Sequence, residues 1–220
     1  HSMRFGIIAA GYISSVNTRA LMACEDVEIV AVANRTVSKA EVMCHELGLN
    51  CPIYSDWKLM LDAEKPDVAV INIYNDLHRE CFLDCCARGI HVLVEKPLSN
   101  TYGECLEMID AAQKAGIKAS VLHTQRYGKI LQTAKAYMDA HAGELGKLIS
   151  INDRISCHYF WEGRNPWHLD PVRSGGGIVM NYGVHQLRLV HQPLSAEARP
   201  ARDRDFLQNE RRGIARKALR

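Results

Sequence analysis

Short apolar runs alternate with amphipathic stretches along the first half of the chain. The apolar runs predict strands at Arg4–Ile8, Glu28–Ala33, Val68–Ile73, His91–Val94 and Lys118–Leu122. Runs that are apolar at every position are typical of parallel strands covered on both faces. The stretches between them have helical spacing, and two begin with a capping-box pattern, Ser38 with Glu41 and Thr101 with Glu104. This pattern predicts an α/β fold, a Rossmann parallel doubly wound sheet.

Composition narrows the class of protein. The chain has 220 residues, 47% of them hydrophobic, and a formal net charge of +2. This is enough apolar material for a substantial core, and the small net charge favours neither nucleic acid nor a membrane surface as a partner. No apolar run approaches the roughly 20 residues that cross a bilayer, so we expect a cytoplasmic protein.

Cysteine and histidine spacing gives no metal signature. The eight cysteines form no C-x-x-C pair, and the ten histidines form no H-E-x-x-H motif. We therefore predict no metal, and we interpret the cysteines as reduced core residues.

The turn after the first predicted strand resembles a degenerate dinucleotide fingerprint. That fingerprint requires glycine at positions 9, 11 and 14, where the chain has Ala9, Gly11 and Ser14. The missing side chain at Gly11 gives room to a pyrophosphate, and the following helix start supplies N–H groups and a favourable dipole. We expect Ala9, Gly11, Tyr12 and Ile13 to bind the cofactor.

The end of the second predicted strand bears on cofactor choice. Asn34 lies 20 residues after Ser14, where an NAD-selective site has Asp or Glu, and Arg35 follows it. A neutral residue followed by a cation suits a 2′-phosphate. The sequence predicts NADP or NAD as cofactor and favours NADP. The alternative is that Arg35 is a solvent-exposed arginine at a helix start, with no role in cofactor binding.

The run from Val92 to Pro97 ends in Glu-Lys-Pro. It delivers Lys96 to the carboxyl edge of the sheet, where open α/β folds bind ligands. Partial burial there can lower the pKa of a lysine enough for proton transfer. The alternative is a surface lysine before a turn proline.

Three motifs together give the chain a family resemblance. They are the turn Gly6–Ser14, the stretch Tyr74–His78 followed by His91–Pro97, and Gly175–His185 with its triple glycine. In order and spacing they resemble the Gfo/Idh/MocA oxidoreductases, NAD(P)-dependent enzymes that act mostly on sugars, inositols and related polyols. The resemblance implies a Rossmann domain, then an α/β domain whose open sheet carries the substrate site. It also implies a homo-oligomer and a cis bond before Pro97.

The resemblance assigns roles to further residues. Near the cofactor it places Asn75, His78, Glu95, Lys96 and Gln125. Lys96 would polarise or position the reacting oxygen, and His185 would be the base. Asn181, one helical turn before His185, stands where many members carry Asp; it can donate a hydrogen bond but cannot hold a proton.

A polar and aromatic cluster precedes the triple glycine. We expect Tyr159, Trp167 and His168 to bind substrate, because aromatic faces stack on sugars and polar tips donate to hydroxyls. A loop packed on the sheet explains the same composition almost as well. In the same region we expect a helix over Ile130–Ala140, a strand over Leu148–His158 and a helix after the glycines.

The composition changes near the end of the chain. We expect the resemblance to end after Val190, and residues 196–220 hold eight basic and four acidic residues. We interpret them as a basic tail from a shifted frame or other truncation, with a nucleic-acid-binding helix as the alternative. The predicted domains are a Rossmann domain at 3–123, a partial substrate and oligomerisation domain at 124–195, and the tail.

The function that follows is hydride transfer between a nicotinamide cofactor and a small-molecule sugar, inositol or related polyol. If the domain at 124–195 is partial, its open sheet is incomplete, and this would impair turnover more than cofactor binding. The alternative is therefore a catalytically silent dinucleotide sensor or regulator of the same fold.

Overall fold

The protein is described from a computed structural model. It covers residues 2–146, 149–150, 152, 154, 156 and 158–187. The chain divides into two compact units, each described by itself. The first contains the residues up to Leu122 together with Trp161–Asn181, and the second contains His123–Phe160 and the residues from Tyr182 onward.

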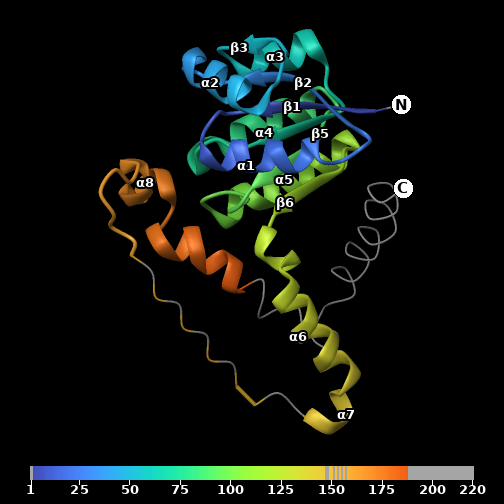
Figure 1. Cartoon of the computed structure of the whole chain (residues 1–220), viewed down its shortest axis with the longest axis vertical. Coiled ribbons are helices and arrows are strands. Elements are labelled where there is room, and N and C mark those ends of the chain that lie inside the picture. The colour runs from blue at the N-terminus through green and yellow to red at the C-terminus, as the bar shows by residue number, and fades with distance from the viewer. Residues whose placement is uncertain are drawn as a thin grey trace. The chain divides into compact units, whose positions relative to one another are not determined.

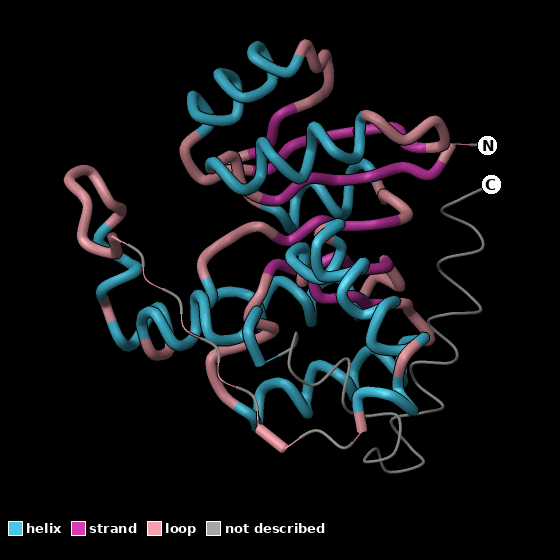
Figure 2. Tube along the Cα trace, turned by 60° about the horizontal axis from the view of Figure 1, so that its bottom comes forward, coloured by secondary structure: helices cyan, strands magenta, loops and turns pink. Residues whose placement is uncertain are grey.

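A six-stranded parallel sheet forms the centre of the first unit. Its strands are β1 (Met3–Ile8), β2 (Val27–Ala33), β3 (Ile53–Tyr54), β4 (Val68–Ile71), β5 (His91–Glu95) and β6 (Ala119–Leu122). They lie in the order β3-β2-β1-β4-β5-β6, which is the doubly wound order of a Rossmann sheet (Figures 1 and 2). This confirms the predicted fold, and the five predicted strands are correct to within two residues at each end.

Helices cover both faces of this sheet. They are α1 (Tyr12–Met22), α2 (Val37–Leu47), α3 (Trp57–Glu64), α4 (His78–Ala87) and α5 (Tyr102–Ala115). Successive strand residues point to opposite faces, so Ile7 and Val70 pack with α2 while Ile8 and Ile71 pack with α3, α4 and α5. Cys44, Cys81, Cys85 and Cys86 are buried free thiols, which confirms the interpretation as core cysteines for these four. Cys24 is an exposed free thiol, so the interpretation is wrong there.

The capping predictions for α2 and α5 had different outcomes. Thr101 is the N-cap of α5, and its hydroxyl accepts the Glu104 N–H at 3.3 Å. The predicted start of α2 at Ser38 is wrong. The helix begins at Val37, and its N-cap Thr36 accepts no hydrogen bond through its side chain.

The first unit also contains a later stretch of the chain. It includes a 3-10 helix at Pro166–Leu169 and the short helix α8 (Pro171–Ser174), which begins at the N-cap Asp170. Gly175 ends α8 with a positive φ of 73°. A Cβ at this position would overlap the Asn100 side chain, which donates to the carbonyls of Val172 and Arg173 at 3.2 and 3.1 Å. Glycine is therefore required by backbone conformation and by close approach.

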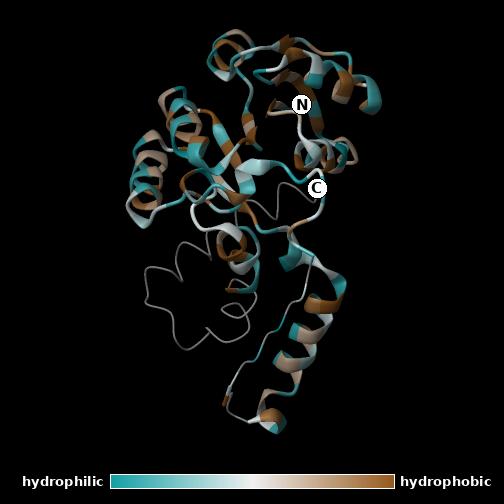
Figure 3. Ribbon diagram, turned by 90° about the vertical axis from the view of Figure 1, so that its left-hand side faces the viewer, coloured by the Kyte–Doolittle hydropathy of each residue, from teal (hydrophilic) through white to brown (hydrophobic). Residues whose placement is uncertain are grey.

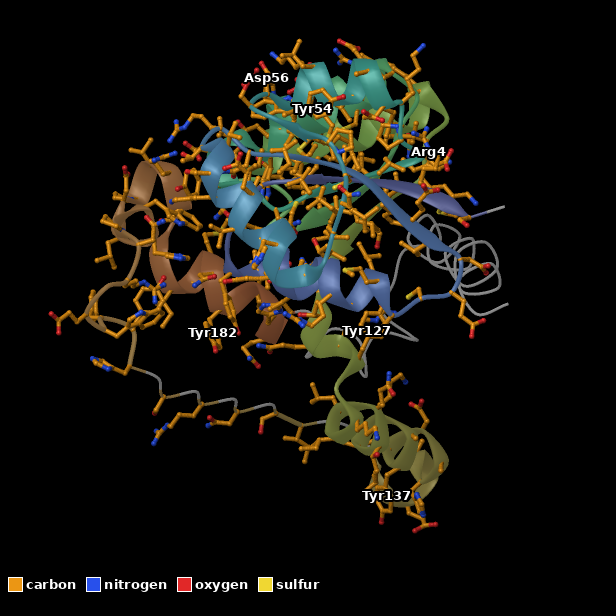
Figure 4. All side chains as sticks on the ribbon, turned by 45° about the horizontal axis from the view of Figure 1, so that its top comes forward. Arg4, Tyr54, Asp56, Tyr127, Tyr137 and Tyr182 are labelled. Carbon is orange, nitrogen blue, oxygen red and sulfur yellow. The ribbon has the colours of Figure 1, made fainter. Side chains whose placement is uncertain are left out.

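The second unit begins with a 3-10 helix at Thr124–Tyr127, followed by α6 (Lys129–Ala140) and α7 (Ala142–Leu145). The predicted helix over Ile130–Ala140 is confirmed. The colouring of Figure 3 alternates between hydrophobic and hydrophilic along α6, and none of its side chains is buried. Tyr137, labelled in Figure 4, stacks on His141 at 4.1 Å.

The predicted strand over Leu148–His158 is not seen at the residues that the structure describes there, which are 149, 150, 152, 154, 156 and 158. A strand requires a paired neighbour, and the described part of the second unit contains no strand to pair with. The predicted helix after the glycines is confirmed: a π-helical turn at Val179–Gly183 continues in helical residues 184–187. The predicted basic tail lies outside the described residues. Within the described part of the chain, no helix is both long and apolar enough to cross a membrane.

Candidate functional site

The candidate site is built on the carboxyl edge of the sheet in the first unit. β1 and β4 are neighbours, but the chain leaves β1 toward α1 on one face and leaves β4 toward α4 on the other. This divergence makes the carboxyl ends of β1 and β4 the topological switch point, the usual ligand position in open α/β folds.

The turn between β1 and α1 has the features of a phosphate cradle. Ala9 has a φ of 92°, the Ser14 hydroxyl donates to the Ala9 carbonyl at 2.6 Å, and the Ala10 N–H donates to Asn34 Oδ1 at 3.1 Å. The N-cap Gly11 supplies no side-chain bond, and a Cβ there would meet no protein atom within 4 Å. The uncapped N–H groups and the helix dipole are thus available to an anion, so the residues fit a dinucleotide pyrophosphate.

Asn34 and Arg35 follow β2 beside this turn. Asn34 accepts from Ala10 through Oδ1 and donates to the Thr36 carbonyl through Nδ2 at 2.7 Å. Its amide therefore holds the turn between β1 and α1 and the β2 edge together, and an ionised aspartate at this position could not donate the second bond. Arg35 is exposed next to it and carries the positive charge of this edge.

A buried polar cluster lies beneath the turn. Its members are Ser14, Asn17, Asn72 and Glu95. Asn17 Nδ2 donates to Asn72 Oδ1 at 2.8 Å and to Glu95 Oε1 at 3.0 Å, and Asn72 Nδ2 donates to Ser14 Oγ at 3.2 Å. Sequence reasoning missed Asn17 and Asn72. The signal for Asn72 was a polar residue directly after four apolar strand residues.

Lys96 follows Glu95 at the end of β5. Its backbone N–H donates to Glu95 Oε2 at 3.1 Å, and its Nζ donates to the Asn181 carbonyl at 2.9 Å and to Asn181 Oδ1 at 2.7 Å. Burial lowers the pKa of Lys96 below its usual value, while the Glu95 charge acts in the opposite direction. Asn181 is neutral, so it solvates the ammonium without compensating its charge. The bond between Lys96 and Pro97 is cis, as the resemblance implied.

Asn75 and His78 occupy the connection between β4 and α4. Asn75 Nδ2 donates to the Ser174 carbonyl at 3.1 Å. His78 is fully buried, with Nδ1 2.9 Å from the Pro97 carbonyl and Nε2 3.1 Å from the Ile73 carbonyl. Burial lowers the pKa of His78, and these carbonyls partly oppose that shift. His78 is thus placed to shape the turn that carries Lys96.

Trp167 and His168 lie in the same unit as Lys96. Their rings stack at 4.0 Å, and Trp167 packs on Tyr74 at 5.2 Å. Burial lowers the pKa of His168 to about 4, and the charges of Arg164 and Lys96 add to the shift. His168 is therefore a neutral imidazole at physiological pH within the electrostatic reach of Lys96.

The remaining predicted residues belong to the second unit. Gln125 lies in the 3-10 helix Thr124–Tyr127. Tyr159 is buried and packs edge-on to Phe160 at 5.7 Å. His185 is buried, with its ring edge-on to His123 at 6.1 Å and to Tyr182 at 6.4 Å. The structure thus brings Lys96 together with Asn181, whereas the meeting of Lys96 with His185 stays a prediction.

Metal ligands do not cluster among the described residues, where no group of three or more His, Cys, Asp or Glu side chains is arranged to hold an ion.

Comparison with known proteins identifies the family. Residues 3–123 match the model of the oxidoreductase family with an NAD-binding Rossmann fold, GFO_IDH_MocA, and residues 131–201 match the GFO/IDH/MocA C-terminal domain. The chain belongs to the Gfo/Idh/MocA family. The C-terminal match of this family member extends to residue 201, so the expectation that the resemblance ends after Val190 is wrong.

Two relatives of this family member are named as a dehydrogenase and a reductase of sugars. It is 27% identical over 189 residues to D-xylose 1-dehydrogenase (NADP(+)) 2 of Haloferax volcanii, covering 85% of this chain and 57% of the relative. It is 29% identical over 199 residues to 1,5-anhydro-D-fructose reductase of Ensifer adhaerens, covering 89% and 58%. The chain thus spans a little over half the length of these relatives.

The fold of this Gfo/Idh/MocA protein also matches solved structures. Levoglucosan dehydrogenase in complex with NADH and levoglucosan aligns with a TM-score of 0.75 at 21% identity, over 88% of this chain and 54% of that one. An NAD-binding protein from Listeria innocua aligns with a TM-score of 0.77 at 23% identity, over 89% and 56%. At these identities the likeness shows the fold.

Proposed function

We propose that the protein transfers a hydride between NADP(H) and a hydroxyl-bearing carbon of a sugar, inositol or related polyol. The observation that carries this proposal is the arrangement at the carboxyl edge, where an uncapped phosphate turn and Lys96 with a lowered pKa lie in one unit. The names of the relatives support the substrate class. Nicotinamide, when bound, supplies the hydride acceptor or donor.

The residues of the chain supply binding and proton handling. Gly11 and the first N–H groups of α1 would hold the pyrophosphate, and Arg35 would meet a 2′-phosphate. Lys96 Nζ would donate to the reacting oxygen, where negative charge develops as the hydroxyl proton leaves. In this proposal His185 takes that proton, because imidazole is the side chain that most often serves as a general base. Trp167 offers an aromatic face to the sugar ring.

Fluorescence titration with NADPH and with NADH tests the cofactor part of the proposal. We expect NADPH to bind at least about tenfold more tightly, which corresponds to ~1.4 kcal/mol. Arg35→Ala should remove most of that preference, and Arg19→Ala, an exposed arginine late in α1, is the matched control. Tighter binding of NADH would overturn the NADP preference, and binding of neither would overturn the proposed function.

A catalytically silent dinucleotide sensor is the second candidate. It is favoured by Asn181, the neutral residue that accepts from Lys96 Nζ and cannot itself take up or release a proton. Lys96→Met separates the candidates. An enzyme should lose about 100-fold or more in turnover in a screen of sugars and polyols, whereas a sensor should bind NADPH as before and show no turnover in either form.

We also propose a cytoplasmic homo-oligomer, following the family resemblance. Light scattering on the purified chain checks the assembly. A monomeric mass at micromolar concentration would contradict it.

A further inference from the structure

The buried polar cluster of Ser14, Asn17, Asn72 and Glu95 connects the backbone of the turn between β1 and α1 to the backbone of Lys96. Counted from the turn, the Ser14 hydroxyl donates to the Ala9 carbonyl and accepts from Asn72. Asn72 accepts from Asn17, and Asn17 donates to Glu95. Glu95 accepts from the Lys96 N–H through its other oxygen. Four side chains, two from α1, one from the residue after β4 and one from β5, thus form one continuous chain of hydrogen bonds.

The direction of this chain is set by Glu95. The Asn17 amide sends both of its donor contacts to oxygen, one on Asn72 and one on the Glu95 carboxylate. A flipped Asn17 would place its own oxygen against those two acceptors. The Asn72 amide is oriented in turn, because its oxygen faces Asn17 and its nitrogen faces the Ser14 hydroxyl. Each buried member therefore has a partner of the required kind.

Glu95 is 6% exposed and its carboxylate is held by neutral donors, Asn17 and the Lys96 backbone. A buried carboxylate depends strongly on each donor that it keeps, because the loss of one leaves an acceptor without compensation. Asn17 is the side-chain donor in this environment. Its loss would leave Glu95 Oε1 without its side-chain donor, so the carboxylate would no longer be held in place from that side.

We propose that Asn17, oriented by Asn72, is a positioning residue that keeps the Glu95 carboxylate fixed beside Lys96. This role adds a residue to those already described around Lys96. It rests on the proposed function only because that proposal makes Lys96 the donor to the reacting oxygen. Asn17 acts through Glu95 and touches neither cofactor nor substrate in this assignment.

The groups that bear on the charge of Lys96 are Glu95, Asn181 and His168. Glu95 raises the pKa of Lys96, and burial lowers it. The neutral Asn181 accepts from its Nζ. His168 is close enough to feel its charge, and Arg164 acts on His168 as well. Of these groups, Asn17 contacts Glu95, so a change at Asn17 reaches Lys96 through the Glu95 charge.

The test is the pH midpoint of acetylation of Lys96 by acetic anhydride, read by peptide mass spectrometry on the full chain without dinucleotide. Exposed Lys39 is the internal reference. Glu95→Gln should lower the Lys96 midpoint by about one pH unit, because it removes the neighbouring negative charge. Asn17→Leu should shift the midpoint in the same direction, and the double variant should shift it no further than Glu95→Gln alone.

Two outcomes would overturn the proposal. In one, Asn17→Leu leaves the midpoint at its original pH while Glu95→Gln moves it; in the other, the two shifts add independently. Asn50→Leu, at an exposed asparagine, is the matched control. If circular dichroism shows that Asn17→Leu does not fold, Asn17→Ser takes its place with a smaller shift of the same sign, and no shift there also overturns the proposal. Since no cofactor is added, failure here is distinct from failure to bind NADPH.

Discussion

Ala9 has an unfavourable backbone conformation at the centre of the candidate phosphate turn. Its φ of 92° lies in a region that L residues with a Cβ rarely adopt, whereas glycine enters it without a steric penalty. The turn is held by the Ser14 bond to the Ala9 carbonyl and by the bond from Ala10 to Asn34. The backbone at this fingerprint position thus keeps the positive φ that glycine favours, although the residue is alanine.

Ala9→Gly should therefore stabilise the protein. Relief of the strained φ outweighs the extra freedom that glycine gains in the unfolded chain, and we expect a gain of about 1 kcal/mol. Urea unfolding of the two forms measures it. Ala10→Gly is the control, since Ala10 has no positive φ, and should be neutral or destabilising. Equal changes in the free energy of unfolding at both positions would contradict the argument that the positive φ of Ala9 is strained.

His168 should make stability depend on pH. Its pKa is lowered from 6.5 to about 4 in the folded protein. Between these two pH values His168 is therefore protonated in the unfolded chain and neutral in the native state. The free energy of unfolding should consequently fall as the pH drops from about 6.5 toward 4. His168→Gln should weaken this dependence, and His45→Gln, at an exposed position, should leave it unchanged. Parallel pH profiles for wild type and His168→Gln would refute the assignment.

The residue scale also shows where sequence reasoning succeeds and fails. Lys96 and Asn181 were singled out by motif, and the structure places them in contact. Asn72 was counted as part of a strand predicted to reach Ile73, so its side chain was treated as one more strand position. Asn17 lies in the middle of α1, where a polar residue usually faces water. Its burial depends on Glu95, 78 residues away, and helical periodicity contains no such information.

At the scale of elements, the sheet was predictable because its central strands are apolar on both faces. β3 was missed because Ile53–Tyr54 is only two residues long and follows Pro52. Its register comes from hydrogen bonds that Val32 and Asn34 donate to the Pro52 and Tyr54 carbonyls. Short edge strands of this kind are defined by their partner rather than by their own pattern.

Gly175 lies where the stretch Trp161–Asn181 packs against Asn100, in the connection between β5 and α5. Gly175→Ala should destabilise the protein by about 2 kcal/mol or more, because its Cβ would both strain the positive φ and displace Asn100. Gly163→Ala is the matched control: it also has a positive φ, but no atom lies within 4 Å of its Cβ, so only strain of about 1 kcal/mol applies. Thermal melting compares them, and equal losses would remove the steric argument.

At the scale of the whole molecule, the two units differ in how they are stabilised. The first has an apolar core on both faces of its sheet, built from residues such as Ile7, Ile71 and Met108. In the second, α6 has 12 residues and buries none of them, and Ile130 is 85% exposed. Isolated helices of about this length are only marginally stable in water. Local stability should therefore differ between the units far more than secondary structure suggests.

Amide hydrogen exchange should resolve this difference. Amides of β1, β4 and β5 should exchange slowest, because they open only with the core, while amides of α6 should exchange at nearly unprotected rates. NADPH at about 100 times its Kd should slow the exchange of globally opening amides in the first unit by up to roughly 100-fold, since a ligand of the native state adds that factor to the unfolding equilibrium. It should leave α6 unchanged. Protection of α6 equal to that of β4 would contradict the predicted difference in local stability. It would require that apolar groups cover Ile130 and its neighbours on that helix. With such cover, the second unit would unfold cooperatively with the rest of the fold.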